Sequence, residues 1–126
     1  MGNPYPPRPD YGPPPPGYAS PEEKNWALLT HFGGIIIGFI APLITLLVKG
    51  PQSPTLRAHA VEALNFQIPW NAALLVGQII SVCSGGFLFF IPLGVWLVMA
   101  VFCVLGGLRA NEGQLYHYPL SARLVS

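Results

Sequence analysis

The stretch from Ala63 to Leu108, ALNFQIPWNAALLVGQIISVCSGGFLFFIPLGVWLVMAVFCVLGGL, contains no Asp, Glu, Lys or Arg in 46 consecutive residues. A transmembrane helix needs about 20 predominantly apolar residues, so this length fits two such helices. The sequence SGG at 84–86 lies near its middle and is typical of a turn. The stretch therefore predicts a membrane-spanning helical hairpin, with helices over about 54–83 and 87–111.

A second stretch without charged residues lies between Lys24 and Lys49 and fits one further membrane helix, over about 26–48. Pro42 cannot donate a hydrogen bond to the carbonyl of Gly38, so we expect this helix to bend there. The whole chain of 126 residues is 52% hydrophobic and only 9% charged, whereas soluble domains average about 25% charged residues. We therefore expect an all-α membrane protein with three transmembrane helices.

Residues 1–21 form a separate segment that is rich in proline and tyrosine. Proline lacks the backbone donor that helices and sheets require, so we expect a disordered or extended tail. Tyr5, Tyr11 and Tyr18 recur along it. The segment is either a solvated tail or a docking arm whose tyrosines contact a partner protein. Residues 22–126 would then form the helical membrane domain.

The basic residues predict an orientation. Three spans would put Lys49, Arg57, Arg109 and Arg123 on one side of the membrane and Lys24 on the other. Because loops with more Lys and Arg remain in the cytoplasm, we expect a multi-pass protein of the plasma membrane with a cytoplasmic C-terminus and the N-terminal tail outside.

Polar residues near the start of the charge-free stretch predict an ion pair. His59 and Glu62 are three residues apart and therefore share one helix face. The helix over 87–111 ends on the same side of the membrane, with Arg109 at a comparable depth. Since an ionised carboxylate near lipid is costly without a partner, we predict that Glu62 pairs with Arg109 and that His59 lies beside them.

Three amides form a polar stripe farther along the same helix. Gln67, Asn71 and Gln78 fall within about 40° of one another at 100° per residue. In lipid such a stripe must face protein or water. It either hydrogen-bonds a neighbouring helix or lines a pathway for an ion, a proton or a polypeptide. The pathway would require several copies, because three helices are too few to enclose a pore.

The chain contains none of the common enzyme motifs: GxSxG, HExxH, CxxC and the phosphate-binding loop are all missing from the sequence. We therefore expect no enzymatic activity, no catalytic or metal-binding residues and no cofactor. The net charge of +1 does not favour nucleic-acid binding, which usually needs a strongly basic surface.

The segments HAVEALNFQ (59–67) and RANEGQLYHYPL (109–120) resemble a widespread family of small prokaryotic membrane proteins described as Tic20-like. The resemblance covers about residues 22–124 and implies a small α-helical membrane bundle, although the chloroplast relatives have four spans. The Pro- and Tyr-rich tail on such a domain is typical of actinobacteria. It also resembles the proline-rich factor associated with actinobacterial respiratory cytochrome bc–oxidase supercomplexes.

Two functions are therefore expected from the sequence. The favoured one is a non-catalytic accessory or assembly subunit that contacts lipid and a larger integral membrane complex, in particular a respiratory one. The alternative is an oligomeric protein-translocation or permeation component, as the Tic20-like resemblance implies.

Overall fold

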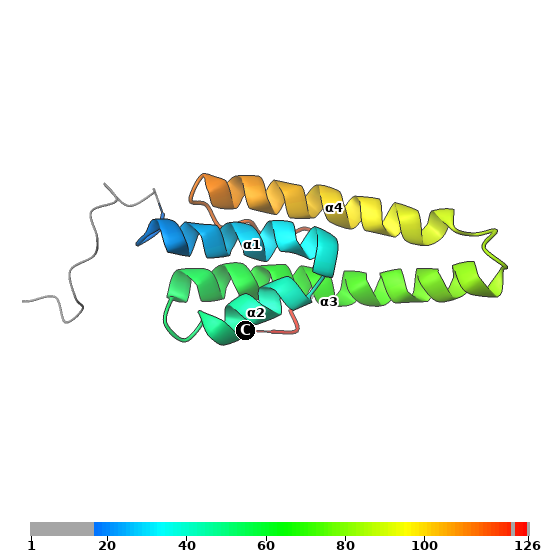
Figure 1. Cartoon of the computed structure of the whole chain (residues 1–126), viewed down its shortest axis with the longest axis horizontal. Helices are drawn as coiled ribbons and strands as arrows, with labels where there is room; N and C mark the ends of the chain where they lie inside the picture. Colours follow the sequence, from blue (N-terminus) through cyan, green and yellow to red (C-terminus); the bar gives the residue numbers. More distant parts are fainter. Residues whose placement is uncertain (1–16, 122, 126) are drawn as a thin grey trace, which may run out of the picture.

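A computed structural model describes residues 17–121 and 123–125 of the chain. Its helices are α1 (Pro21–Ile37), α2 (Ile40–Val48), α3 (Pro54–Cys83) and α4 (Phe90–Asn111), and the described residues contain no β-strand. Helices α3 and α4 form a long hairpin, α1 packs beside both, and α2 packs against α1 and α3 (Figure 1). The all-α prediction is confirmed.

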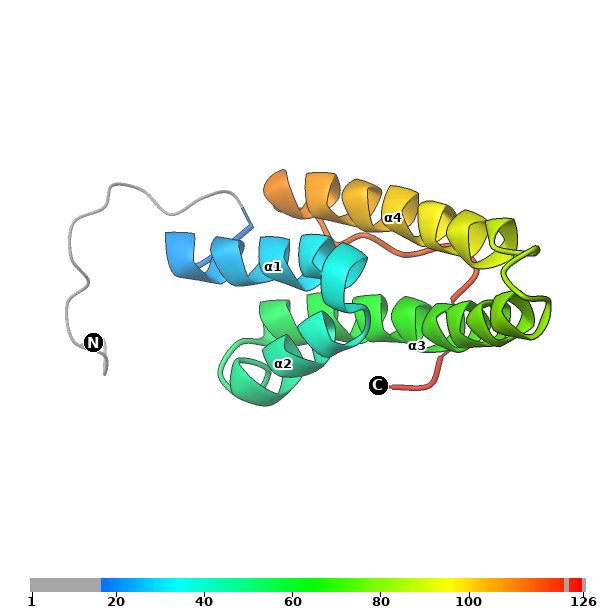
Figure 2. The same ribbon diagram turned by 45° about the vertical axis from the view of Figure 1, so that its right-hand side comes forward.

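The number of spans differs from the prediction. Among the described residues two helices, α3 and α4, are long and apolar enough to cross a membrane, not three. The expected helix over 26–48 is instead two shorter helices of 17 and 9 residues. Figure 2 shows α2 running back beside α1, and the α3–α4 hairpin extending beyond the bend that joins them.

Gly38 is the point at which the chain reverses. Its φ of 62° and ψ of −137° lie outside the helical region and are accessible mainly to glycine. Pro42 leaves the carbonyl of Gly38 without its usual helical donor, and the N–H of Ala41 donates to that carbonyl instead, at 3.3 Å. Pro42 lies in the first turn of α2, where a missing donor costs little. The predicted bend is therefore a complete break, four residues earlier than the proline.

Serine–proline pairs begin both α1 and α3. Ser20 accepts a hydrogen bond from the backbone N–H of Glu23, and Ser53 accepts one from that of Leu56, each at 3.1 Å. In each case a proline occupies the first helical position, where its fixed φ suits the helix. The α3 boundaries agree with the prediction of 54–83, and α3 continues through Pro69.

The described residues after α4 run back across the helices (Figure 2). Asn65 of α3 accepts hydrogen bonds from the backbone N–H groups of Leu124 and Val125, and Trp70 donates its indole N–H to the carbonyl of Leu120. Tyr118 is buried in a cluster with Ala63, Phe66 and Met99. Tyr118 thus anchors the C-terminal segment in the core.

Candidate functional site

Four titratable side chains meet inside the helical bundle and form what we call the Tyr–His network: Tyr18, His31, His59 and Tyr118. They come from the segment before α1, from α1, from α3 and from the C-terminal segment. Each is at most 6% exposed. A buried polar group must form hydrogen bonds to offset its loss of water, so these side chains can be buried only because they contact one another.

The hydrogen bonds of the Tyr–His network run in one direction. Tyr18 donates its hydroxyl to the carbonyl of Ala110 at 2.6 Å, so its oxygen can accept from Nε2 of His59 at 3.5 Å. His59 then has Nδ1 free to accept from Nε2 of His31, at 3.0 Å. The remaining Nδ1 of His31 accepts the hydroxyl proton of Tyr118, at 2.5 Å.

This pattern fits neutral histidines. A neutral imidazole has one donor and one acceptor nitrogen, whereas a protonated one has two donors. Each histidine of the network meets one partner at each ring nitrogen. Burial raises the pKa of Tyr18 to about 12 and raises the pKa of Tyr118 well above its usual range, which keeps both phenols protonated as donors. The network joins four parts of the chain.

Two glycines of α4 make room for this network and for α1. A Cβ atom at Gly106 would collide with the hydroxyl of Tyr118 and with Nδ1 of His31. A Cβ atom at Gly107 would collide with the ring of Phe32. Small residues allow helices to approach closely, and here they bring the α1 side chains against α4.

The amide stripe of α3 contacts the bend between α1 and α2. Asn71 accepts a hydrogen bond from the backbone N–H of Phe39 at 3.0 Å and donates to the side-chain oxygen of Gln67 at 2.8 Å. Gln67 donates in turn to the sulfur of Cys103 on α4, at 2.8 Å. On the other side of the bend, Trp96 donates its indole N–H to the carbonyl of Ile35 at 3.0 Å. Asn71 and Trp96 thus bond backbone groups on the two sides of the break in the helix.

Gln78, the third member of the predicted stripe, lies apart from this group. Its side chain is exposed on α3. Within the described residues, only the first two amides therefore bond to neighbouring elements.

Glu62 and Arg109 have other partners than the ones we predicted. A carboxylate oxygen of Glu62 lies 3.2 Å from Nδ1 of His117, and Arg109 donates to the side chain of Gln114 at 3.1 Å. Both partners belong to the segment after α4, so this segment supplies the contacts that we expected the two residues to make with each other. His59, predicted as their neighbour, points instead into the Tyr–His network.

Of the three tyrosines predicted to contact a partner, only Tyr18 lies within the described residues. Tyr5 and Tyr11 lie outside them. Tyr18 is buried against its own bundle, with its ring stacked on His59 at a centroid distance of 5.9 Å. Tyr18 therefore joins the start of α1 to the start of α3 and the end of α4. Its side chain is not available to a partner protein.

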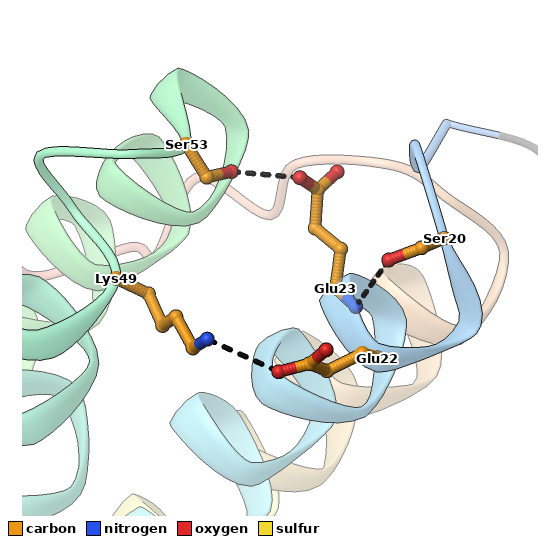
Figure 3. Close-up of polar contacts among 5 residues, drawn as sticks. All are labelled: Ser20, Glu22, Glu23, Lys49 and Ser53. Atoms are coloured by element: carbon orange, nitrogen blue, oxygen red, sulfur yellow. Dashed lines mark hydrogen bonds and ion pairs between the residues drawn. The ribbon is translucent and has the colours of Figure 1, made fainter. Parts of the chain in front are cut away.

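A second group of polar contacts joins the start of α1 to the loop between α2 and α3 (Figure 3). Lys49 lies 3.0 Å from Glu22, and its ammonium group is 5.5 Å from the ring centroid of Trp26. Ser53 donates to the carboxylate of Glu23 at 2.9 Å. Exposed ion pairs add little stability, but the contacts show that both ends of the α1–α2 unit lie at one end of the molecule.

No group of three or more His, Cys, Asp or Glu side chains within residues 17–121 and 123–125 is arranged to hold a metal ion. His31 and Tyr118 were missed by the sequence analysis. They are 87 positions apart, and neither follows a recognisable motif. The adjacent pair Gly106 and Gly107 was the available signal, because small residues mark a close helix contact.

The family model for the magnetosome magnetite crystal formation proteins, MamF/MmsF, matches residues 22–125. The chain belongs to this family. No curated protein and no solved structure matches it. The MamF/MmsF match includes both segments on which the Tic20-like resemblance was based, so that resemblance, and the one to the respiratory proline-rich factor, were wrong. The roles that we expected from these resemblances, in an actinobacterial respiratory complex or in protein translocation, were therefore wrong as well.

Proposed function

We propose that this chain is a non-catalytic integral membrane protein that takes part in magnetite crystal formation. The observation that carries this proposal is the family match, which extends over residues 22–125 and thus over nearly all of the described structure. In the proposed arrangement α3 and α4 span the membrane, and α1 and α2 enter it and return to the same face.

The surface of the α3–α4 hairpin supports membrane insertion. Large apolar side chains are exposed along both helices, including Val82 at 76% and Val101 at 56%. The 30 residues of α3 extend about 45 Å, longer than the roughly 30 Å hydrocarbon layer. Its first turns, with Arg57 and Glu62, therefore lie at the membrane surface.

The contacts at the α1–α2 bend support the re-entrant arrangement. Non-helical backbone at membrane depth is tolerated only where protein or water satisfies its polar groups. Asn71 and Trp96 bond the backbone on the two sides of Gly38. The Glu22–Lys49 ion pair joins the two outer ends of the unit, as expected if both ends reach the same membrane face.

This arrangement revises the orientation. Four basic residues lie in or beside the first or last turns of helices at the same end of the bundle, namely Lys24, Lys49, Arg57 and Arg109. The opposite end, residues 83–90, carries no charge. The positive-inside rule then puts the charged end in the cytoplasm. The start of α1 and the end of α4 share that side, in contrast to the external N-terminal segment that three spans would give.

The Tyr–His network supports a non-catalytic role. Each of its four side chains is buried and hydrogen-bonded to another member or to backbone. Its donors and acceptors are thus used in joining the helices to the C-terminal segment.

Cysteine labelling in intact cells tests the arrangement. We expect a membrane-impermeant maleimide to label the exposed native Cys83 from outside the cell. Ala19→Cys and Glu112→Cys, each made in a Cys83→Ser background, should both react only after the membrane is opened. Buried Cys103 should stay unlabelled and serves as the internal control. Labelling of position 19 from outside and position 112 from inside would contradict the re-entrant unit.

Complementation tests the role in crystal formation. We would express the chain in a magnetite-forming bacterium that lacks its own family member and measure crystal diameters by electron microscopy. The expected result is crystals larger than those of the empty-vector strain. Cys83→Ser should act like the wild type, whereas Asn71→Leu, which removes the hydrogen bond at the bend, should act less well. Crystals of unchanged size despite a correctly inserted protein would refute the proposed role.

A further inference from the structure

An apolar groove of about 500 Å³ lies between α2 and α3. Leu43 and Leu46 of α2 line one side, and Leu64, Ile68 and Leu75 of α3 line the other. Leu75 is 62% exposed, so the described residues leave this end of the groove uncovered. In the proposed arrangement both sides of the groove lie within the membrane, where lipid chains can enter it.

The polar residue in the wall of this groove does not call for a polar ligand. Asn71 accepts a hydrogen bond from the backbone N–H of Phe39 and donates one to the side chain of Gln67. Its amide is therefore engaged inside the protein. The interior of the groove thus fits a hydrocarbon chain, which brings no polar group that would lose its water.

The groove is about as long as one lipid leaflet is thick. Leu64 and Leu75 are eleven residues apart, which is about 16 Å along α3, and half of the hydrocarbon layer is about 15 Å. Leu64 follows two residues after Glu62, which lies at the membrane surface in the proposed arrangement. The groove therefore runs from the membrane surface to the middle of the bilayer, as an acyl chain of one leaflet does.

Arg57 lies at the outer end of the same face of α3. Three residues of the groove wall are within about 20° of it around the helix, at 100° per residue: Leu64, Ile68 and Leu75. Arg57 is exposed and lies about 10 Å outward from Leu64 along the helix, at the depth of lipid headgroups. Glu62 lies about 140° away around the helix, so its negative charge is not on this face.

Arg57 suits a phosphate better than Lys49, the basic residue at the end of α2. Lys49 already pairs with Glu22 at 3.0 Å. A guanidinium has five N–H donors in a planar fork that matches phosphate, so Arg57 can bind a phosphate and keep another contact. A choline or ethanolamine headgroup would add a positive charge beside this guanidinium, which favours an anionic headgroup instead.

We propose that the groove between α2 and α3 binds one acyl chain of an anionic phospholipid, with the lipid phosphate bonded to Arg57. The hydrocarbon chain covers the apolar walls, and the headgroup meets the basic residue at their outer end. This proposal rests on the membrane insertion proposed above, but it does not depend on the role in crystal formation.

Photocrosslinking tests the occupant. The full-length protein is placed in phosphatidylcholine vesicles that contain a small share of phosphatidylglycerol with a diazirine in its acyl chain, and the adducts are mapped by mass spectrometry. We expect adducts at Leu43, Leu46 and Ile68 that unlabelled phosphatidylglycerol suppresses and that oleic acid does not. Adducts spread evenly around α3 and α4, or equal suppression by oleic acid or added phosphatidylcholine, would overturn the proposal.

The headgroup contact is tested by titrating the unlabelled phosphatidylglycerol. Arg57→Gln should weaken its binding about five-fold, the effect of one basic side chain on the affinity for anionic lipid, and Arg57→Lys should retain most of the affinity. Arg109→Gln is the matched control, because Arg109 is an exposed arginine at the same end of the bundle on α4, which does not line the groove. Equal affinities for the two glutamine variants would overturn the role of Arg57.

The groove itself is tested by filling it. Ala72 lines the groove, whereas Ala73 is exposed on α3 about 100° farther around the helix. Ala72→Phe should remove the groove adducts, and Ala73→Phe should keep them, with circular dichroism showing equal helix content. Adducts that persist in Ala72→Phe would overturn the site. Carbonate extraction separates the two proposals: protein released by it refutes the membrane insertion, whereas retained protein without groove adducts refutes the lipid site alone.

Discussion

Replacing His31 with phenylalanine should destabilise the protein by about 2–5 kcal/mol. The change removes the acceptor for the hydroxyl of Tyr118 and the donor for Nδ1 of His59, both of which are buried. A buried polar group that loses its partner costs about 1–3 kcal/mol, and two such groups are created here. Thermal unfolding of the detergent-solubilised protein, followed by circular dichroism, measures the effect as a lower midpoint.

His117→Phe is the matched control for this prediction. The His117 side chain is 73% exposed, and surface substitutions usually change stability by about 0.5 kcal/mol or less. A second readout is cleavage by chymotrypsin after Tyr116, which should be slow in the wild type and faster in His31→Phe, because the C-terminal segment loses its contact with α1. Equal midpoints for the two histidine variants would show that the Tyr–His network contributes little to stability.

Replacing Gly106 with alanine should destabilise the protein by about 1–3 kcal/mol, the usual cost of adding volume to a packed core. The added methyl group would collide with Tyr118 and His31, which are both buried and cannot move into solvent. This cost must exceed the gain of about 0.5–1 kcal/mol that alanine brings to a helix. The midpoint of thermal unfolding should therefore fall.

Gly94→Ala supplies the comparison within the same helix. A Cβ atom there meets nothing within 4 Å, so this variant should keep the wild-type stability or gain from the better helix former. If Gly106→Ala and Gly94→Ala unfold at the same temperature, α1 and α4 are farther apart than the structure indicates. A combined His31→Phe and Gly106→Ala variant should be less destabilised than the sum, because both changes act on the Tyr118 contact.

Local patterns in the sequence were sufficient to predict the long hairpin. The charge-free stretch and the SGG turn led to the observed boundaries of α3, and α4 begins three residues later than expected because Phe87 to Phe89 belong to the turn. The same patterns failed for the first helix. Its length and hydrophobicity fit a span, and only the backbone at Gly38 shows that it reverses.

The candidate site was predicted in part. Hydrogen bonding to a neighbouring element was one of two interpretations of the amide stripe, and Gln67 and Asn71 form such bonds. The partner of Glu62 was not predictable in the same way, because the segment after α4 has no periodic pattern that would reveal its return over the bundle. Helical periodicity predicts which side chains share a face, but it does not predict which segment packs against that face.

The sequence by itself determined that the chain is helical, where α3 begins and ends, and that a long apolar hairpin separates the charged residues from the far turn. These features depend on hydrophobicity, capping and turn residues that are neighbours in the chain. Only the tertiary structure decided that α1 and α2 reverse at Gly38, and that Tyr18, His31, His59 and Tyr118 form one network. Those contacts join residues up to 87 positions apart, and they form because buried donors and acceptors must find partners wherever the packing of the helices brings them together.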